Sequence, residues 1–175
     1  MSGFQGPGPA VHALVDRLST DLAGHVAQVN SEYEDDLAIP DVDARLVYPY
    51  MPTIGELNQF PAIGVEHGPG ELEDDIGSSA TEVYDLSVVV FVQSAQQDIL
   101  SEYARRTLVA VVRCVMQDRN LGSGPGIPWG VTCRKIDPGP ALTSRTSGDE
   151  GTDPAPPKAY MTWVALTVRV KSDWD

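Results

Sequence analysis

The three histidines, His12, His25 and His67, are the residues best suited to metal binding or acid–base chemistry. His12 and His25 belong to one predicted helix, but the thirteen-residue step between them does not bring two imidazole rings to one metal ion. His67 lies between Glu66 and the acidic run at residues 71–75, whose carboxylates could bind a cation. That run lacks the alternating Asp and Asn positions of a calcium loop, so a solvated acidic stretch is the favoured interpretation. We predict no metal site and no cofactor.

The serines and cysteines show no spacing that is typical of catalysis. The serines at positions 78, 79, 87, 94 and 101 lie outside any G-x-S-x-G sequence. The glycine-rich GSGPG at 122–126 is not followed by Lys and Ser or Thr, so it does not match a phosphate-binding loop. Cys114 and Cys133 match no metal-ligand spacing and are predicted to be small buried thiols, with a disulfide between them left open. We therefore predict that the protein is not an enzyme.

Composition limits the partners of the chain. Its 175 residues suit one domain with a substantial core, and 42% of them are hydrophobic. The net charge is −13 and the pI is about 4.4, so ordinary binding to nucleic acid phosphates is not expected. The charge is also consistent with solubility alone. The N-terminal residues lack the pattern of a signal peptide, and no apolar run is long enough to suggest a membrane span.

Two amphipathic helices are predicted from apolar residues that recur at three- and four-residue steps. The first begins at Pro9, which suits the first turn of a helix, and continues to Val29. The second follows Ser94–Gln97, which match the S-x-x-Q capping box, and ends near Asn120. Because the second helix follows a strand so closely, we expect Val88 and Val90 of the strand to pack against Leu108 and Val111 of the helix.

The stretch VYDLSVVVFV (83–92) predicts the central strand of a sheet. One face is apolar throughout, whereas the other begins with Asp85 and Ser87 and turns apolar at Val89 and Phe91. Further strands are predicted at residues 45–48, 60–67, 129–136 and 160–171, the last two as a hairpin. The fold class is therefore α+β, with a mostly antiparallel sheet and two main helices packed on one face.

The domain organisation follows from the same pattern. Residues 9–175 form a single domain after a flexible N-terminal arm at residues 1–8, which is rich in Gly and Pro. Two segments rich in Gly, Pro, Ser and acidic residues, about 68–80 and 137–157, are predicted to be mobile loops.

Three segments together resemble the tail terminator proteins of long-tailed bacteriophages, also called tail-completion or minor tail proteins. They are FPAIGVEHGPGE (60–71), YDLSVVVFVQSAQQDILSEYARRTLVAVVRCVMQDRNLG (84–122) and YMTWVALTVRVKS (160–172). The resemblance is one of architecture: an N-terminal helix, an "FPAI" strand, an acidic loop, a central strand that leads into a long helix, and a final hairpin. The 137–157 loop and the N-terminal arm do not map onto the family.

The resemblance implies a structural virion protein without catalysis or cofactors. Such a protein forms a homo-oligomeric ring, a hexamer in this family, that ends the tail tube and joins the tail to the head. The implied partners are the tail tube protein and head-completion or connector proteins, in a virion assembled in the host cytoplasm, with no membrane. Genomic DNA would pass through the lumen without specific binding, which suits an acidic surface.

Five residues are the candidate subunit contacts in such a ring. On the second helix, Arg105, Arg106 and Arg113 could face an acidic run of the next subunit, EYEDD (32–36) or ELEDD (71–75). On the last strand, Met161 and Trp163 could contact a neighbour through their face, and the apolar second face of residues 83–92 would need similar cover. Alternative functions are another neck component, such as a head-completion or connector protein, and a cellular α+β binding module.

Overall fold

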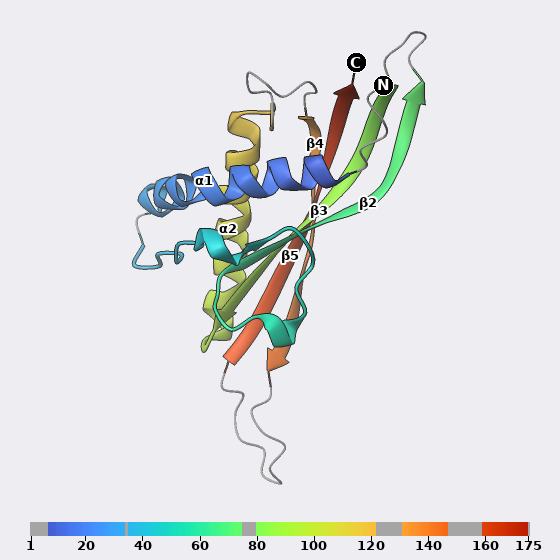
Figure 1. Cartoon of the computed structure of the whole chain (residues 1–175). Helices are drawn as coiled ribbons and strands as arrows, with labels where there is room; N and C mark the ends of the chain where they lie inside the picture. Colours follow the sequence, from blue (N-terminus) through green and yellow to red (C-terminus); the bar gives the residue numbers. More distant parts are fainter. Residues whose placement is uncertain (1–6, 34, 75–79, 122–130, 147–158, 175) are drawn as a thin grey trace.

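The computed structural model describes residues 7–33, 35–74, 80–121, 131–146 and 159–174, with part of their side chains. Two helices pack beside one long, twisted sheet (Figure 1). The helices are α1 (Gly8–Glu32) and α2 (Gln97–Gln117). The strands are β1 (Val47–Tyr48), β2 (Ala62–Asp74), β3 (Ala80–Ser94), β4 (Val131–Thr146) and β5 (Ala159–Trp174). Two short 3-10 turns, η1 (Ala44–Leu46) and η2 (Ile54–Glu56), lie between α1 and β2.

The sheet has the strand order β1-β2-β3-β5-β4. The β1–β2 pair is parallel and the three other pairs are antiparallel, so the sheet is mixed but mostly antiparallel. The α+β fold class is confirmed, as are the central position of β3 and the C-terminal hairpin of β4 and β5.

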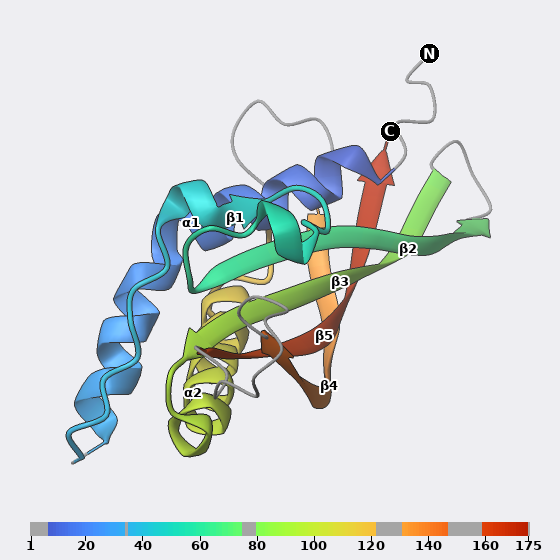
Figure 2. The same cartoon turned by 90° about the horizontal axis from the view of Figure 1, so that it is seen from below.

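The main core lies between the helices and one face of the sheet. The predicted contact partners Val88, Val90 and Val111 are fully buried in one apolar cluster, and Leu108 packs against it. From α1, the cluster receives the predicted stripe of residues at three- and four-residue steps: Val11, Leu14, Leu18, Leu22, Val26 and Val29. Figure 2 shows the far ends of β2 and β3 extending beyond both helices.

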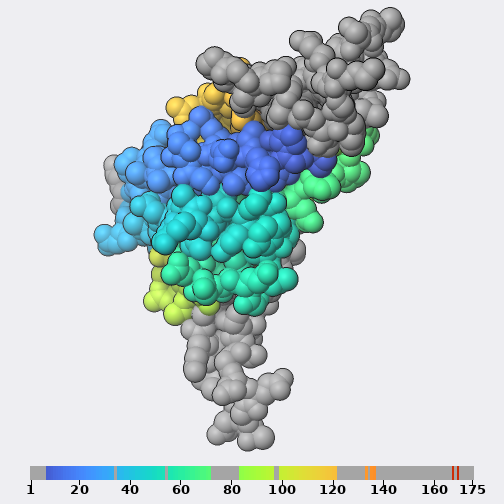
Figure 3. All heavy atoms as spheres, in the orientation of Figure 1, coloured from blue at the N-terminus to red at the C-terminus, as the bar shows by residue number. Residues whose placement is uncertain are grey.

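A second, smaller cluster covers part of the opposite face of the sheet. Residues 46–60, here called the strap, lead from η1 to β2 and pack against Val89 and Phe91 of β3 and Ala62 of β2. Figure 3 shows the strap, in cyan, beside α1 on the surface. The apolar second face of β3 is therefore covered by its own chain at these positions. This corrects the expectation that Val89 and Phe91 need a neighbouring subunit.

Close approach of the strap to β2 requires a glycine at position 64. A Cβ atom there would lie 2.7 Å from the Cδ atom of Pro52 and 3.1 Å from the backbone oxygen of Tyr50. We expect Gly64→Ala to lower the free energy of unfolding by about 1–3 kcal/mol, because the strap must move away from the sheet. The matched control is Gly24→Ala in α1, where nothing lies within 4 Å of the added methyl group. That change should raise stability by about 0.5–1 kcal/mol, since alanine favours the helix. Urea unfolding of both variants measures the difference between their free energies of unfolding. If the two substitutions change this free energy equally, the close contact between the strap and Gly64 is disproved.

Several predicted boundaries are wrong. Helix α2 starts after the N-cap Gln96, and no side chain caps it, so Ser94–Gln97 do not form a capping box. Instead, Ser94 Oγ accepts a hydrogen bond from Gln96 N at 3.1 Å. Near the N-terminus, α1 begins at Gly8, inside the arm predicted at residues 1–8. Residues 1–6 lie outside the described part of the structure.

Both predicted loops are partly strand. β2 continues through the first half of the 68–80 segment to Asp74, and a register shift between His67 and Gly70 accommodates Gly68 and Pro69. β4 runs through residues 137–146 in spite of Pro138 and Pro140. An edge strand tolerates prolines because its outer N–H groups have no ladder partner, and β4 is such an edge. The remainder of both predicted loops, 75–79 and 147–157, is not among the described residues.

Candidate functional site

The side chains first considered for catalysis are spread over the surface. His12 is exposed on α1, and the His67 Nδ1 atom lies 3.2 Å from the backbone oxygen of Gly68. The His25 Nε2 atom lies 2.7 Å from Gln117 Oε1, across the contact between α1 and α2. An open recess of about 370 Å³ surrounds this pair; it is lined by Arg17, Asp21, Gly24, His25, Gln28 and Gln117. Within the described residues, no three His, Cys, Asp or Glu side chains are grouped to hold a metal ion.

The two cysteines are buried and free. Burial raises the pKa of the Cys114 thiol to about 11, and it also raises the pKa of Cys133. Both thiols belong to the main core cluster, as predicted. A thiol with a raised pKa carries little thiolate at neutral pH, so neither residue is a reactive nucleophile in this fold.

Arg106 is the centre of a buried ion-pair cluster on α2. Its side chain is only 3% exposed. The guanidinium donates both terminal nitrogens to the Asp35 carboxylate, and Nη1 also donates to the backbone oxygen of Leu37 at 2.6 Å. Its Nε donates to Glu102 Oε1 at 2.7 Å, and the ring of Tyr33 lies 3.8 Å from its Cζ atom. The three nitrogens of this arginine thus make four hydrogen bonds within the chain, which indicates a structural role.

The other two candidate arginines of α2 bind the same stretch of chain. Arg105 donates to Glu102 Oε1 at 2.5 Å and to the Tyr33 hydroxyl at 2.9 Å. Arg113 donates to Glu32 Oε1 at 2.7 Å. Hydrogen bonds from Arg105 and then from Arg106 lower the pKa of Glu102 to about 2, and the hydrogen bond from Arg106 lowers the pKa of Asp35.

The three arginines therefore contact acidic residues of their own chain, whereas the predicted acidic partner belongs to the next subunit. Glu32, Tyr33 and Asp35 belong to the EYEDD run, which begins at the last residue of α1, and each of the three contacts an arginine of α2. Together with Arg105, Arg106, Arg113 and Glu102, these residues are here called the arginine clamp. In the single chain, the Arg106 side chain is buried and cannot contact another subunit, whereas the side chains of Arg105 and Arg113 remain partly exposed. Contact of these arginines with another subunit stays a prediction.

The candidates Met161 and Trp163 belong to β5 by their backbone. Met161 pairs with Gln93 and Trp163 with Phe91, so both lie in the centre of the sheet next to β3. Their side chains are outside the described part of the structure, so their role at a subunit interface also stays a prediction.

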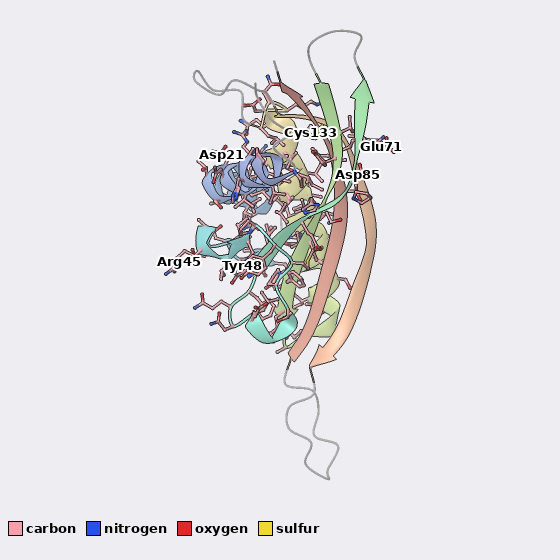
Figure 4. All side chains as sticks on the ribbon, turned by 45° about the vertical axis from the view of Figure 1, so that its right-hand side comes forward. Asp21, Arg45, Tyr48, Glu71, Asp85 and Cys133 are labelled. Atoms are coloured by element: carbon pink, nitrogen blue, oxygen red, sulfur yellow. The ribbon has the colours of Figure 1, made fainter. Side chains whose placement is uncertain are left out.

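Beyond the strap, the outer sheet face contains an ion-pair network around Arg169. Arg169 of β5 pairs directly with Asp85 of β3, and its Nε lies 3.2 Å from Asp85 Oδ1. Its Nη2 lies 3.8 Å from Glu71 Oε2 of β2, so one cation links three strands. Figure 4 shows Asp85 and Glu71 on the side of the sheet away from α1, where no described helix lies. Sequence reasoning missed this trio because the strand register that aligns residues 85 and 169 is not visible in the sequence.

Within the described residues, neither helix is long and apolar enough to cross a membrane.

A search of solved structures finds a chain of "Virion of native gene transfer agent (GTA) particle" with a TM-score of 0.42 and 16% sequence identity. The alignment covers 97% of this chain and 99% of that chain, but at this score the similarity supports no argument about function. No protein-family model matches the sequence, and no curated protein matches it either.

Proposed function

We propose that the chain is a structural virion protein that forms a ring, terminates a phage tail tube and joins the tail to the head. One observation carries this proposal. The three sequence segments that resemble tail terminator proteins fold into β2, into β3 with α2, and into β5. These strands are consecutive neighbours in the sheet order. The resemblance therefore falls on one continuous structural unit rather than on scattered elements.

The dimensions of the strands favour assembly with other subunits. β3, β4 and β5 have 15, 16 and 16 residues, which corresponds to roughly 50 Å each at about 3.3 Å per residue. Strands in globular proteins usually have about 5–6 residues. Figure 1 shows α2 alongside the strands and the tip of β2 and β3 lying clear of both helices. A hairpin that extends past its own core buries little surface in a single chain, and a neighbouring molecule can complete it.

The function is tested by deleting the gene from a genome that produces particles and imaging the lysate by negative-stain electron microscopy. Loss of a tail terminator should give tails of uncontrolled length and heads without tails, and a plasmid copy of the gene should restore normal particles. A head-completion or connector protein predicts a different result, namely tails of normal length that fail to join heads. Normal-length tails joined to heads would exclude both neck functions.

A further inference from the structure

Charge is distributed unevenly across the sheet, and it changes sign from one edge to the other. β2 has four acidic residues and no lysine or arginine, and β3 has two acidic residues and no lysine or arginine. β5 has two basic residues and one acidic residue, and β4 has three basic residues and one acidic residue. In the spatial order β2-β3-β5-β4 the net strand charges are therefore −4, −2, +1 and +2, in a chain whose net charge is −13.

The two ends of this gradient are open edges of the sheet. β1 pairs with β2 only at Ile63 and Gly64, which leaves the outer side of β2 from Val65 to Asp74 without a strand partner among the described residues. On the other edge, no described strand pairs with the outer side of β4, although the Cys133 N–H donates there to the backbone oxygen of Arg119 at 2.8 Å. Glu66 and Glu71 of β2 are exposed, and so is Lys135 of β4.

We infer that the acidic β2 edge of one copy docks against the basic β4 edge of a second copy. Opposite charges on two different surfaces of the same molecule favour a head-to-tail contact, and such contacts close into rings when the rotation between copies allows it. The contact matters only if the chain forms the proposed ring, and it identifies the surfaces that form it. These surfaces are the two sheet edges rather than the arginines of α2.

The contact is made by side chains, not by a continuous backbone ladder. Pro138 and Pro140 remove two N–H donors from β4, and the register shift between His67 and Gly70 interrupts β2. Such edges resist uncontrolled strand pairing. Complementary charge then selects the one orientation in which β2 meets β4, because β2 against β2 or β4 against β4 would place like charges together.

Charge reversal tests this docking on the purified chain. We expect Glu66→Lys and Lys135→Glu each to raise the dissociation constant of assembly at least tenfold in analytical ultracentrifugation, and the double variant to recover most of the loss. The control Arg45→Glu changes the net charge as Lys135→Glu does. Arg45 projects from η1 on the side away from Glu71 and Asp85 (Figure 4), so reversing its charge should change the dissociation constant of assembly by less than about twofold.

Raising the salt from about 0.1 to 1 M should weaken wild-type assembly, because the Debye length falls from about 10 to 3 Å.

A zero-length carbodiimide crosslink provides the second measurement. Within one copy, β3 and β5 separate β2 from β4, and three strand spacings amount to about 14 Å. A direct amide bond between Glu66 or Glu71 and Lys135 in a mixture of ¹⁴N- and ¹⁵N-labelled chains should therefore carry one label from each copy. Assembly that survives both single reversals, without this crosslink, would overturn the edge contact while leaving the ring intact. A wild-type chain that stays monomeric, alone and with tail tubes, would overturn the ring and the edge contact together.

Discussion

Replacing Val111 by aspartate is expected to lower the free energy of unfolding by about 3–5 kcal/mol. Val111 is 0% exposed and belongs to the apolar cluster between α2 and the sheet. A carboxylate at this position loses its hydration and leaves the aliphatic contacts of the valine unmade. A single domain is usually stable by about 5–15 kcal/mol, so the variant should be close to unfolding at room temperature. Urea unfolding followed by circular dichroism measures the effect.

The control for this prediction is Met116→Asp on the same helix. Met116 is 39% exposed, so an aspartate there remains hydrated. Its cost should be about 1 kcal/mol or less, mainly from a negative charge near the C-terminal end of a helix. If Val111→Asp unfolds at the same urea concentration as Met116→Asp, the assignment of Val111 to the core is wrong.

Removing the Arg106 side chain should have the second largest effect. Arg106→Ala breaks the hydrogen bonds to Asp35, to Glu102 and to the backbone oxygen of Leu37, together with the stacking on Tyr33. Hydrogen bonds to charged groups contribute about 1.5–3 kcal/mol in net terms. The Asp35 side chain is 50% exposed and water can replace part of the lost partner, so we expect a total loss of about 2–3 kcal/mol.

The neighbouring arginine is a matched control for the clamp. Arg105 is 52% exposed and also contacts Glu102 and Tyr33, but its ion pair and its hydrogen bond to the Tyr33 hydroxyl lie at the surface. Arg105→Ala should therefore cost less than about 1 kcal/mol. Equal losses for the two variants would contradict the buried role of Arg106. Hydrogen exchange at residues 35–39 gives an independent measure, because only the loss of Arg106 should release this segment.

The clamp also predicts how stability depends on pH. Because the pKa of Glu102 is lowered to about 2 in the folded chain, Glu102 contributes stability that is present above its unfolded pKa near 4.5. This contribution is lost as the pH falls from about 4.5 to 2. Asp35 acts in the same direction, since its pKa is also lowered. Glu102→Gln should flatten the acid limb of a plot of unfolding free energy against pH, and an unchanged acid limb would exclude Glu102 as a contributor.

Elements with strong local patterns were predictable from the sequence. Apolar steps of three and four residues located α1 and α2, and alternation located β3 and β5, because burial on one face constrains every residue in such elements. The ends of β2 and β4 were not predictable. Gly68, Pro69, Pro138 and Pro140 are turn formers by local preference, but long neighbouring strands hold them in the sheet.

The sequence predicted that the arginines of α2 pair with acidic residues, but it did not predict correctly which chain supplies those residues. The acidic partner of these arginines, EYEDD or ELEDD, was expected in the next subunit, whereas the structure shows contacts to EYEDD of the same chain. Charge alone cannot distinguish a partner in the same chain from one in the next. The strap was missed for a related reason. Residues 46–60 have no periodicity, and their packing on Val89 and Phe91 depends on a path around the sheet edge that only the tertiary structure reveals.

The strand order has a consequence for the time course of folding. β2 with β3 and β4 with β5 are hairpins between strands consecutive in sequence, whereas the central β3–β5 seam pairs Leu86 with Val168 and Asp85 with Arg169. Such distant partners meet slowly because a long loop must close first. The acidic hairpin and the basic hairpin attract each other during this search, which should favour the seam. At high concentration, the same attraction should also draw in a hairpin from another chain, so we expect exchange of the β4–β5 hairpin between chains as a misfolding route.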